Sequence, residues 1–460
     1  MKRFLFLLLL GFSLSLVFAQ SEDDLFSEDA LFGEDILEGS DDALFGSEDD
    51  LFSNDDDLFA DDGIVDVPDV NAKTDLSKGI IFQNGLVKVG GSLDASITTD
   101  TVLYSPAEKP LNENIYETRL TPKLNALLSV DARPTEVLRI YTKFGIAYPS
   151  LLNWFKLKEL FTDFSIKDTA FFRFGIHTVT WGAGYFFSPV SDMINTSSID
   201  PQNPTAQVDG ALNLRTQIVF PNTQNCLWFY IIPSTNFQNQ TAETYARETA
   251  LAGKVDILLG GWELGLGGYW KYQNAPKAML TATGSLKKVS FFGEFVYSYG
   301  AAAEWRENKE WEDKTNIIQA TAGLSYYWKD PLITLAAQYY FNNNDKDVES
   351  YLLGGHNIAT VVNFGKVFGT KDVTATIFAM ANFGRKELEA SDRENLTKAK
   401  ISDELIDSMT GNSLMINATI FYSPVSALKI GMGPTLTFKT FEKNLTVSLK
   451  LTASLGGGKF

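Results

Sequence analysis

The stretch KNLTVSLKLTASL, residues 443–455, decides the fold class of this chain. From Leu445 onward, Leu, Val and Ala take every second position, and Thr, Ser and Lys take the positions between them. Neighbouring side chains on a β-strand point to opposite faces, so the stretch predicts a strand with one apolar and one polar face. A membrane barrel needs such strands, and a half-buried strand of a soluble sandwich has them too. The rest of the chain has to decide between these two architectures.

Alternating segments of about ten residues recur from about residue 85 onward, which is typical of tilted membrane strands. Turn residues separate these segments, which are 87–100, 115–130, 136–147, 156–167, 169–181, 211–220, 226–234, 248–259, 262–273, 276–286, 288–299, 317–328, 331–341, 357–368, 371–383, 413–423, 427–440 and 443–455. Single-chain bacterial barrels have even strand numbers. The sequence therefore predicts an all-β fold, a transmembrane antiparallel β-barrel of 16–18 strands, over residues 76–460.

Aromatic residues and connection lengths support a membrane position. Trp262, Trp270 and Trp328 stand near segment ends, where an amphipathic ring can sit at the level of lipid headgroups. Connections alternate between tight turns such as Lys329-Asp330 and long loops such as 385–412. Short turns on one side and long loops on the other are expected of an outer-membrane barrel.

The N-terminus has the features of a secretory signal. Lys2 and Arg3 precede an apolar run, and Val17 and Ala19 fit the small-residue rule for cleavage before Gln20. We therefore predict a signal peptide at 1–19 and a mature protein in the cell outer membrane. Cys226 is the only cysteine, so no internal disulfide can form.

An acidic segment follows the signal. Residues 21–70 contain 20 of the 57 Asp and Glu residues and no Lys or Arg, while the chain from residue 71 onward carries equal numbers of acids and bases. Such a density of like charge predicts disorder over residues 20–75. Five Leu-Phe pairs recur in this segment, with phenylalanines at Phe26, Phe32, Phe45, Phe52 and Phe59. We expect the segment to lie in the periplasm and favour multivalent binding of a periplasmic partner over a solubilising spacer.

Residues 173–195 contain Arg173, Gly175, Thr180-Trp181-Gly182, Pro189, Asp192 and Ile194-Asn195. This passage resembles the strand-to-loop region of large bacterial porin-like families, which implies an outer-membrane barrel. By the same resemblance residues 183–205 are a candidate constriction loop, and a plain extracellular loop is the expected alternative. The terminal Phe460 resembles the assembly signal through which a last strand meets the barrel-assembly machinery.

Alternation also assigns inward-facing residues, because the positions opposite the apolar face must point into the lumen. The predicted pore-lining residues are Arg119, Lys123, Arg139, Lys143, Arg173, His177 and Arg215. Two interpretations stay open: a basic wall of a water-filled channel, or a structural network in which these cations pair with acids such as Glu117 and Asp163.

The sequence contains no pattern that requires catalysis. His177 and His356 are the only histidines, and neither accompanies a nucleophile motif or a cluster with metal-ligand spacing. We expect no enzyme activity, no cofactor, no metal and no nucleic-acid partner. The expected partners are outer-membrane lipid, the assembly machinery and the periplasmic partner of the acidic segment. The predicted function is a porin-like channel for small hydrophilic solutes that prefers anions. The alternatives are an adhesive or structural barrel that acts through its long loops, and a transporter for hydrophobic compounds.

Overall fold

A computed structural model describes most of the barrel region. The described residues are 73–75, 80–83, 86–104, 118–148, 155–167, 169–221, 223, 225–235, 241–347, 353–385, 393, 411–425, 427–439 and 444–459. The predicted signal peptide, residues 20–72 of the acidic segment and Phe460 lie outside this set, so what was expected of them stays a prediction.

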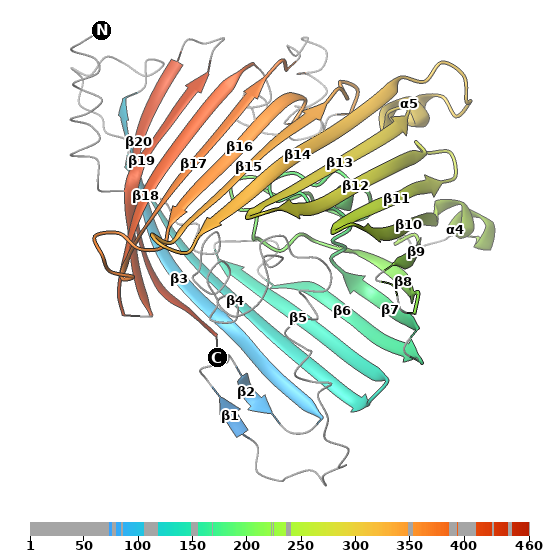
Figure 1. The fold of residues 1–460 in the computed structure, drawn as a ribbon, viewed down its shortest axis with the longest axis horizontal. Coiled ribbons are helices and arrows are strands. Elements are labelled where there is room, and N and C mark those ends of the chain that lie inside the picture. The colour runs from blue at the N-terminus through green and yellow to red at the C-terminus, as the bar shows by residue number, and fades with distance from the viewer. Residues whose placement is uncertain are drawn as a thin grey trace.

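Eighteen antiparallel strands form the wall of a closed barrel (Figure 1), and each corresponds to one of the eighteen predicted segments. The strands are β3 (Val87–Tyr104), β4 (Thr118–Thr135), β5 (Leu138–Tyr148), β6 (Phe155–Ile166), β7 (Ala170–His177), β8 (Ala211–Val219), β9 (Cys226–Ile232), β10 (Ala250–Leu259), β11 (Trp262–Lys271), β12 (Lys277–Leu286), β13 (Val289–Tyr299), β14 (Asn316–Trp328), β15 (Ile333–Asn342), β16 (Gly355–Phe364), β17 (Val373–Phe383), β18 (Ser413–Val425), β19 (Leu428–Lys439) and β20 (Asn444–Lys459). The prediction of an all-β antiparallel barrel is confirmed. β7 is shorter than its predicted segment 169–181, because the chain leaves the wall after His177.

The barrel closes where β20 pairs with β3. Thr452 lies opposite Thr98 in this seam, and their hydroxyl oxygens are 3.3 Å apart. Gly456 has φ +113°, and a Cβ there would lie 2.1 Å from the carbonyl oxygen of Leu93, so only glycine fits this position. The seam leaves no exposed edge between the first and last strands of the wall.

Two short strands precede the wall. β2 (Ile80–Gln83) pairs with the start of β3, and β1 (Lys73–Asp75) pairs with β2. Figure 1 shows both strands beside the start of β3 and near the C-terminus. They extend the sheet at one end of the barrel, in a region for which the sequence pattern predicts no strand.

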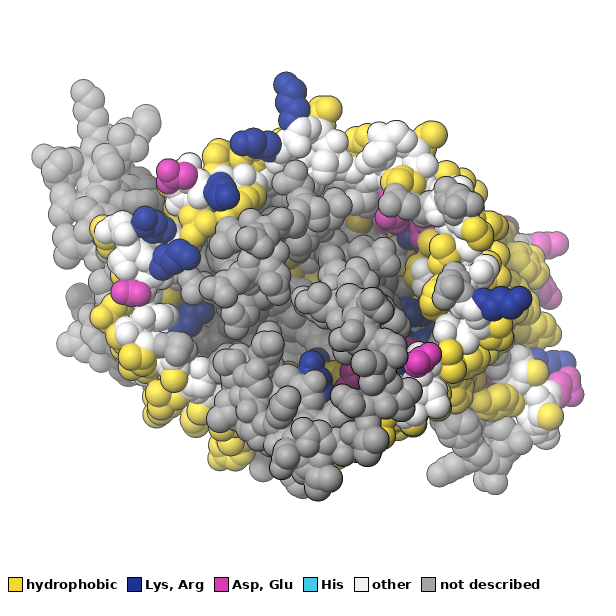
Figure 2. All heavy atoms as spheres, turned by 60° about the horizontal axis from the view of Figure 1, so that its bottom comes forward, with side chains coloured by type: hydrophobic (Ala, Val, Ile, Leu, Met, Phe, Trp, Pro, Cys, Tyr) yellow, Lys and Arg dark blue, Asp and Glu magenta, His cyan; other side chains and the backbone are white. Residues whose placement is uncertain are grey.

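The two faces of the wall differ in chemistry. Large apolar side chains on the outer face are unusually exposed, among them Leu120 at 62%, Leu266 at 62% and Leu280 at 51%. Polar residues such as Gln338 and Asn357 occupy the inner face and are buried. Figure 2 shows hydrophobic side chains around the outside of the ring. This outside suits lipid, and the inside suits water and polar groups.

Connections differ between the two ends of the barrel. Short connections follow every even-numbered strand from β4 to β18. The longest of them is the eight-residue connection 365–372. The other end, after the odd-numbered strands, carries the longer loops, with the short helices α4 (Ala242–Glu248) and α5 (Ala302–Glu307). We call these the short-turn end and the long-loop end. Among the residues described, no helix is long and apolar enough to cross a membrane.

Candidate functional site in the barrel lumen

The predicted cations lie on the inner face of β4, β5, β7 and β8, four of five consecutive strands in which β6 separates β5 from β7. β4 carries Arg119 and Lys123, and β5 carries Arg139 and Lys143. β7 and β8 add three further side chains, Arg173, His177 and Arg215. The register supports the inward direction, because Lys123 is opposite the buried Ser96 and Lys143 is opposite Ser129, which shares the inner face with Asp131. Their role as pore-lining residues stays a prediction.

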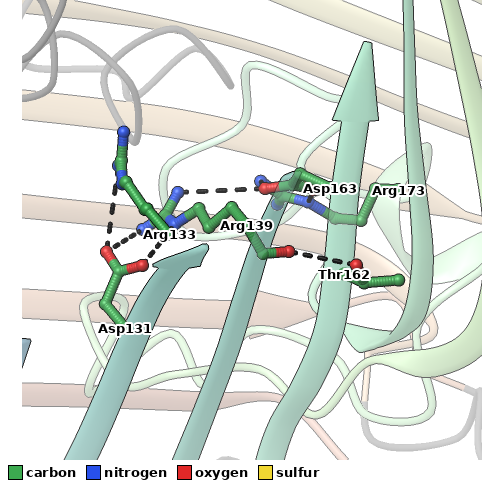
Figure 3. Close-up of polar contacts among 6 residues, drawn as sticks. All are labelled: Asp131, Arg133, Arg139, Thr162, Asp163 and Arg173. Carbon is green, nitrogen blue, oxygen red and sulfur yellow. Dashed lines mark hydrogen bonds and ion pairs between the residues drawn. The ribbon is translucent and has the colours of Figure 1, made fainter. Parts of the chain in front are cut away.

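A ladder of ion pairs crosses this wall (Figure 3). The Arg139 guanidinium lies 3.0 Å from the Asp131 carboxylate and 3.9 Å from that of Asp163. The Nε of Arg173 donates to Asp163 at 2.6 Å, and Arg133 reaches Asp131 at 3.8 Å. For Arg139 and Arg173, the structure therefore supports the network interpretation. Each carboxylate is shared by two arginines, so the ladder keeps a net positive charge.

Aromatic rings contact two arginines of the ladder, Arg139 and Arg173. The guanidinium of Arg173 lies 4.0 Å from the centre of the Phe161 ring, and that of Arg139 lies 5.3 Å from the centre of the Tyr141 ring. At such distances a guanidinium is attracted to the face of an aromatic ring. Arg139 and Arg173 therefore each combine a carboxylate contact with an aromatic contact.

A β-bulge adds two lysines that alternation alone assigns to the lipid side. The register of β5 against β6 shifts between Lys143, opposite Glu159, and Phe144, opposite Leu157. Lys158 is the extra residue, so it and Lys156 point inward with Glu159 instead of outward. Both lysines contact the carboxylate of Asp209, and Lys158 does so at 3.2 Å. No feature of the sequence pattern marks this bulge.

Cations outnumber carboxylates on this side of the lumen. The inner faces of β3–β8 and β20 present, among the residues described, the cations Lys88, Arg119, Lys123, Arg133, Arg139, Lys143, Lys156, Lys158, Arg173, Arg215 and Lys450 and the carboxylates Asp94, Asp100, Asp131, Glu159 and Asp163. Arg119 and Lys123 are exposed, while Arg173 and Arg215 are almost fully buried. Lys88, near the short-turn end, is exposed as well, so this wall offers accessible positive charge toward both of its ends.

His177 is fully buried at the point where β7 leaves the wall. Its ring meets Phe161 edge-on, with the ring centres 5.9 Å apart. A Cβ on Gly210 would lie 1.8 Å from the carbonyl oxygen of His177, so the returning chain packs directly against this residue. His177 lies on the predicted inner face and is covered by the chain that returns to the wall at Gly210.

Residues 178–210 fold into the lumen, and we call them the inward segment. Phe186 and Phe187 are buried against inward residues of β15, β16 and β17, including Ala359 and Phe378. A second cluster packs the segment against β9, β10, β12 and β13, and its members are Val179, Trp181, Val190, Met193, Ile194, Trp228, Tyr230, Ala252, Met279 and Val296. The candidate constriction loop, 183–205, belongs to this segment. The alternative of a plain extracellular loop is wrong for it.

Buried polar groups of the barrel wall hold the inward segment through hydrogen bonds. Glu294 of β13 accepts hydrogen bonds from the amides of Gly184 at 2.6 Å and Val190 at 3.0 Å and from the Ser188 hydroxyl. Gln338 of β15 accepts from the amide of Phe186 and donates to the carbonyl of Phe187. Gly182 and Gly184 are required here, because a Cβ on Gly182 would lie 2.2 Å from the Glu294 carboxylate and a Cβ on Gly184 would lie 1.9 Å from the carbonyl oxygen of Phe187. Since a buried carboxylate is costly unless it is hydrogen-bonded, these contacts define one position for the segment.

A charged contact reinforces this position. Lys254 of β10 donates to the carbonyl oxygen of Trp181 at 3.0 Å and pairs with Asp256 at 2.9 Å. Asp256 also accepts from the indole of Trp228. The inward segment is therefore anchored to the wall opposite the ladder, and it is joined to the ladder side through Asp209.

The fold and this interior define a transmembrane β-barrel whose lumen is narrowed by its own chain.

No protein-family model matches the sequence, and no curated protein matches it. Solved structures similar in fold include OccK10 (OpdN) of Pseudomonas aeruginosa, with a TM-score of 0.46 and 12% identity over 80% of this chain and 99% of that one. OccK2 (OpdF) of the same organism, in complex with glucuronate, has a TM-score of 0.47 and 9% identity over 80% and 97% of the two chains. The outer-membrane channel DcaP of Acinetobacter baumannii has a TM-score of 0.44 and 11% identity over 80% and 97%.

Proposed function

We propose that this protein is an outer-membrane channel for small hydrophilic solutes and that it prefers anions. The observation that supports the proposal is the arrangement of the inward segment opposite a predominantly basic wall. A barrel of eighteen strands is wide enough to leave an aqueous channel unless chain folds into it. The inward segment narrows the lumen from one side, so a solute would pass beside Arg119, Lys123 and the arginine ladder.

Electrostatics supports the anion preference. Charges that line a low-dielectric passage focus the field and raise the local concentration of oppositely charged ions. The shared carboxylates Asp131 and Asp163 neutralise only part of the ladder. The lysines turned inward by the β6 bulge add further positive charge.

Planar-bilayer recordings under a KCl gradient test this function. The expected result is a stable conductance with a reversal potential that indicates anion preference. The double variant Arg119→Glu and Lys123→Glu should lose this preference, because it reverses two exposed charges of the wall. The matched control, Arg119→Lys and Lys123→Arg, keeps both charges and should behave as the parent protein does.

Two results would contradict the proposal. A correctly folded barrel without conductance would favour an adhesive or structural role of the long loops. Cation preference in the parent protein would show that the basic wall does not govern passage.

A further inference from the structure

The short-turn end carries a row of lysines on its connections. Five exposed lysines of the connections after β12, β14 and β16 form what we call the basic rim: Lys287, Lys288, Lys329, Lys366 and Lys371. The only carboxylates on these connections are Asp330 and Asp372. Within the described part of the chain, no ion pair involves any of the five lysines. Figure 2 shows Lys and Arg side chains spaced along the rim at its upper left, with few Asp and Glu between them.

Phe368 lies in the middle of the basic rim. It is 77% exposed, more than any other large hydrophobic residue that the structure describes. Its φ is +52°, a left-handed conformation that is rare for a bulky side chain, and Gly369 beside it has φ +79°. Strain of this kind at an exposed site suggests a function, because a small residue would serve a plain turn better. Lys366 and Lys371 stand on either side of Phe368 in the sequence of this connection.

The described chain begins at the same end, with the paired strands β1 and β2. Lys73 pairs with Gln83, and Gln83 pairs with Lys88 near the start of β3. Because successive strands alternate in direction, the start of β3 and the connections after even-numbered strands lie at one end of the barrel. The acidic residues precede Lys73 in the sequence, so they join the described chain at the short-turn end, which carries the basic rim.

We propose that the basic rim and Phe368 form the docking surface for the chain's own acidic segment, residues 21–70. The charges are complementary, since this segment carries 20 carboxylates and no base. Its Leu-Phe pairs supply apolar side chains that match the exposed ring of Phe368. The inference concerns the rim alone and does not depend on which solute passes through the barrel.

The tether makes weak contacts sufficient. The composition of residues 21–70 predicts disorder, and a random-coil chain of about 50 residues has a root-mean-square length of about 40 Å, enough to reach along the rim from β1. Tethering gives an effective concentration on the order of millimolar. Exposed lysine–carboxylate pairs contribute little individually, so several pairs and the Leu-Phe contacts act together. Such binding is multivalent and sensitive to salt.

Photocrosslinking in the full chain tests the docking. Benzoylphenylalanine replaces Phe32 or Phe52, the protein is purified in detergent, and adducts are mapped by mass spectrometry after irradiation. Crosslinks should concentrate on connections 287–288, 329–332 and 365–372. They should fall several-fold in 1 M NaCl, where the Debye length is about 3 Å.

Matched variants distinguish the rim from other surfaces. The pair Lys366→Glu and Lys371→Glu should reduce the crosslinks several-fold, whereas Lys309→Glu and Lys346→Glu, at the long-loop end, should leave them unchanged. Phe368→Gly removes the ring and relieves the strained φ, so a loss of crosslinks in this variant reflects the ring and not misfolding.

Three outcomes would overturn the proposal. Crosslinks on β4–β7 would place the acidic segment in the lumen. An absence of intramolecular crosslinks would mean that the segment serves a separate partner. Rim crosslinks that persist unchanged in 1 M NaCl would exclude docking by charge.

Discussion

Leu449 and Ser448 are neighbours on β20, but they face different surroundings. Leu449 is opposite Pro434 and points outward, while Ser448 is opposite Thr435, a buried inner residue. At the residue scale, this alternation is what makes each position tolerant or intolerant of charge.

We expect Leu449→Arg to destabilise the barrel by about 2–4 kcal/mol, because it places a cation against lipid near the middle of the band. Ser448→Arg puts the same side chain in the lumen and should cost little. Urea unfolding of both variants in lipid vesicles measures the difference. Equal destabilisation at the two positions would contradict the assignment of faces.

The arginines of the ladder show why a residue type alone does not define a role. Arg119 is exposed on the inner face, whereas Arg173 is held by Asp163 and Phe161 and is almost fully buried. Removing one partner of a buried ion pair costs more than removing an exposed charge. The exposed cations are therefore better probes of selectivity than the buried ones.

At the scale of elements, the inward segment depends on Glu294. Replacing Glu294 by Ala leaves the amides of Gly184 and Val190 without acceptors, at a cost of about 1–3 kcal/mol for each buried group. We expect the segment to loosen and single-channel conductance to rise and become noisier. Glu307→Ala, on α5 outside the lumen, is the control. Unchanged conductance in Glu294→Ala would show that the segment does not limit passage.

The α5 loop gives a pH-dependent element. Partial burial opposes ionisation of Glu304, but hydrogen bonds from the Thr315 hydroxyl and from the amides of Ala301 and Thr315 outweigh it and hold the pKa of Glu304 below its usual range. A carboxyl with a lowered pKa stabilises the fold above its unfolded pKa of about 4.3, and this contribution is lost as pH falls through the lowered value.

We therefore expect the loop to loosen in acid below about pH 4. The edge-on pair of Trp305 and Trp311, with ring centres 5.1 Å apart, should report the change by near-ultraviolet circular dichroism. Glu304→Gln should abolish this transition, and Glu310→Gln should retain it. A transition of the same midpoint in Glu304→Gln would assign it to another group.

At the scale of the whole molecule, closure governs stability. Each strand from β3 to β20 has a neighbour on both sides, so no edge is left from which unfolding could begin. We expect the protein to migrate as a compact band on detergent gels until it is boiled. Deletion of residues 21–70 should preserve this behaviour, because the wall begins at β3. Loss of the compact band after deletion would make the acidic segment an assembly element.

The sequence by itself determined the strands, their two faces and the existence of the barrel. These features follow from a local rule, since alternation with period two is written into each segment and needs no distant contact. The strand candidates and the inward parity of Arg139 and Arg173 were therefore predictable. The candidate constriction 183–205 came instead from the resemblance of residues 173–195 to porin-like families.

Only the tertiary structure decided how the lumen is filled and charged. Lys156 and Lys158 face inward because a bulge shifts the register of β6, and a bulge reflects the fit between two strands rather than the pattern of one. The position of the inward segment is set by Glu294 and Gln338, more than 100 residues away in sequence. Contacts of this range depend on closure of the barrel, so no local pattern can specify them.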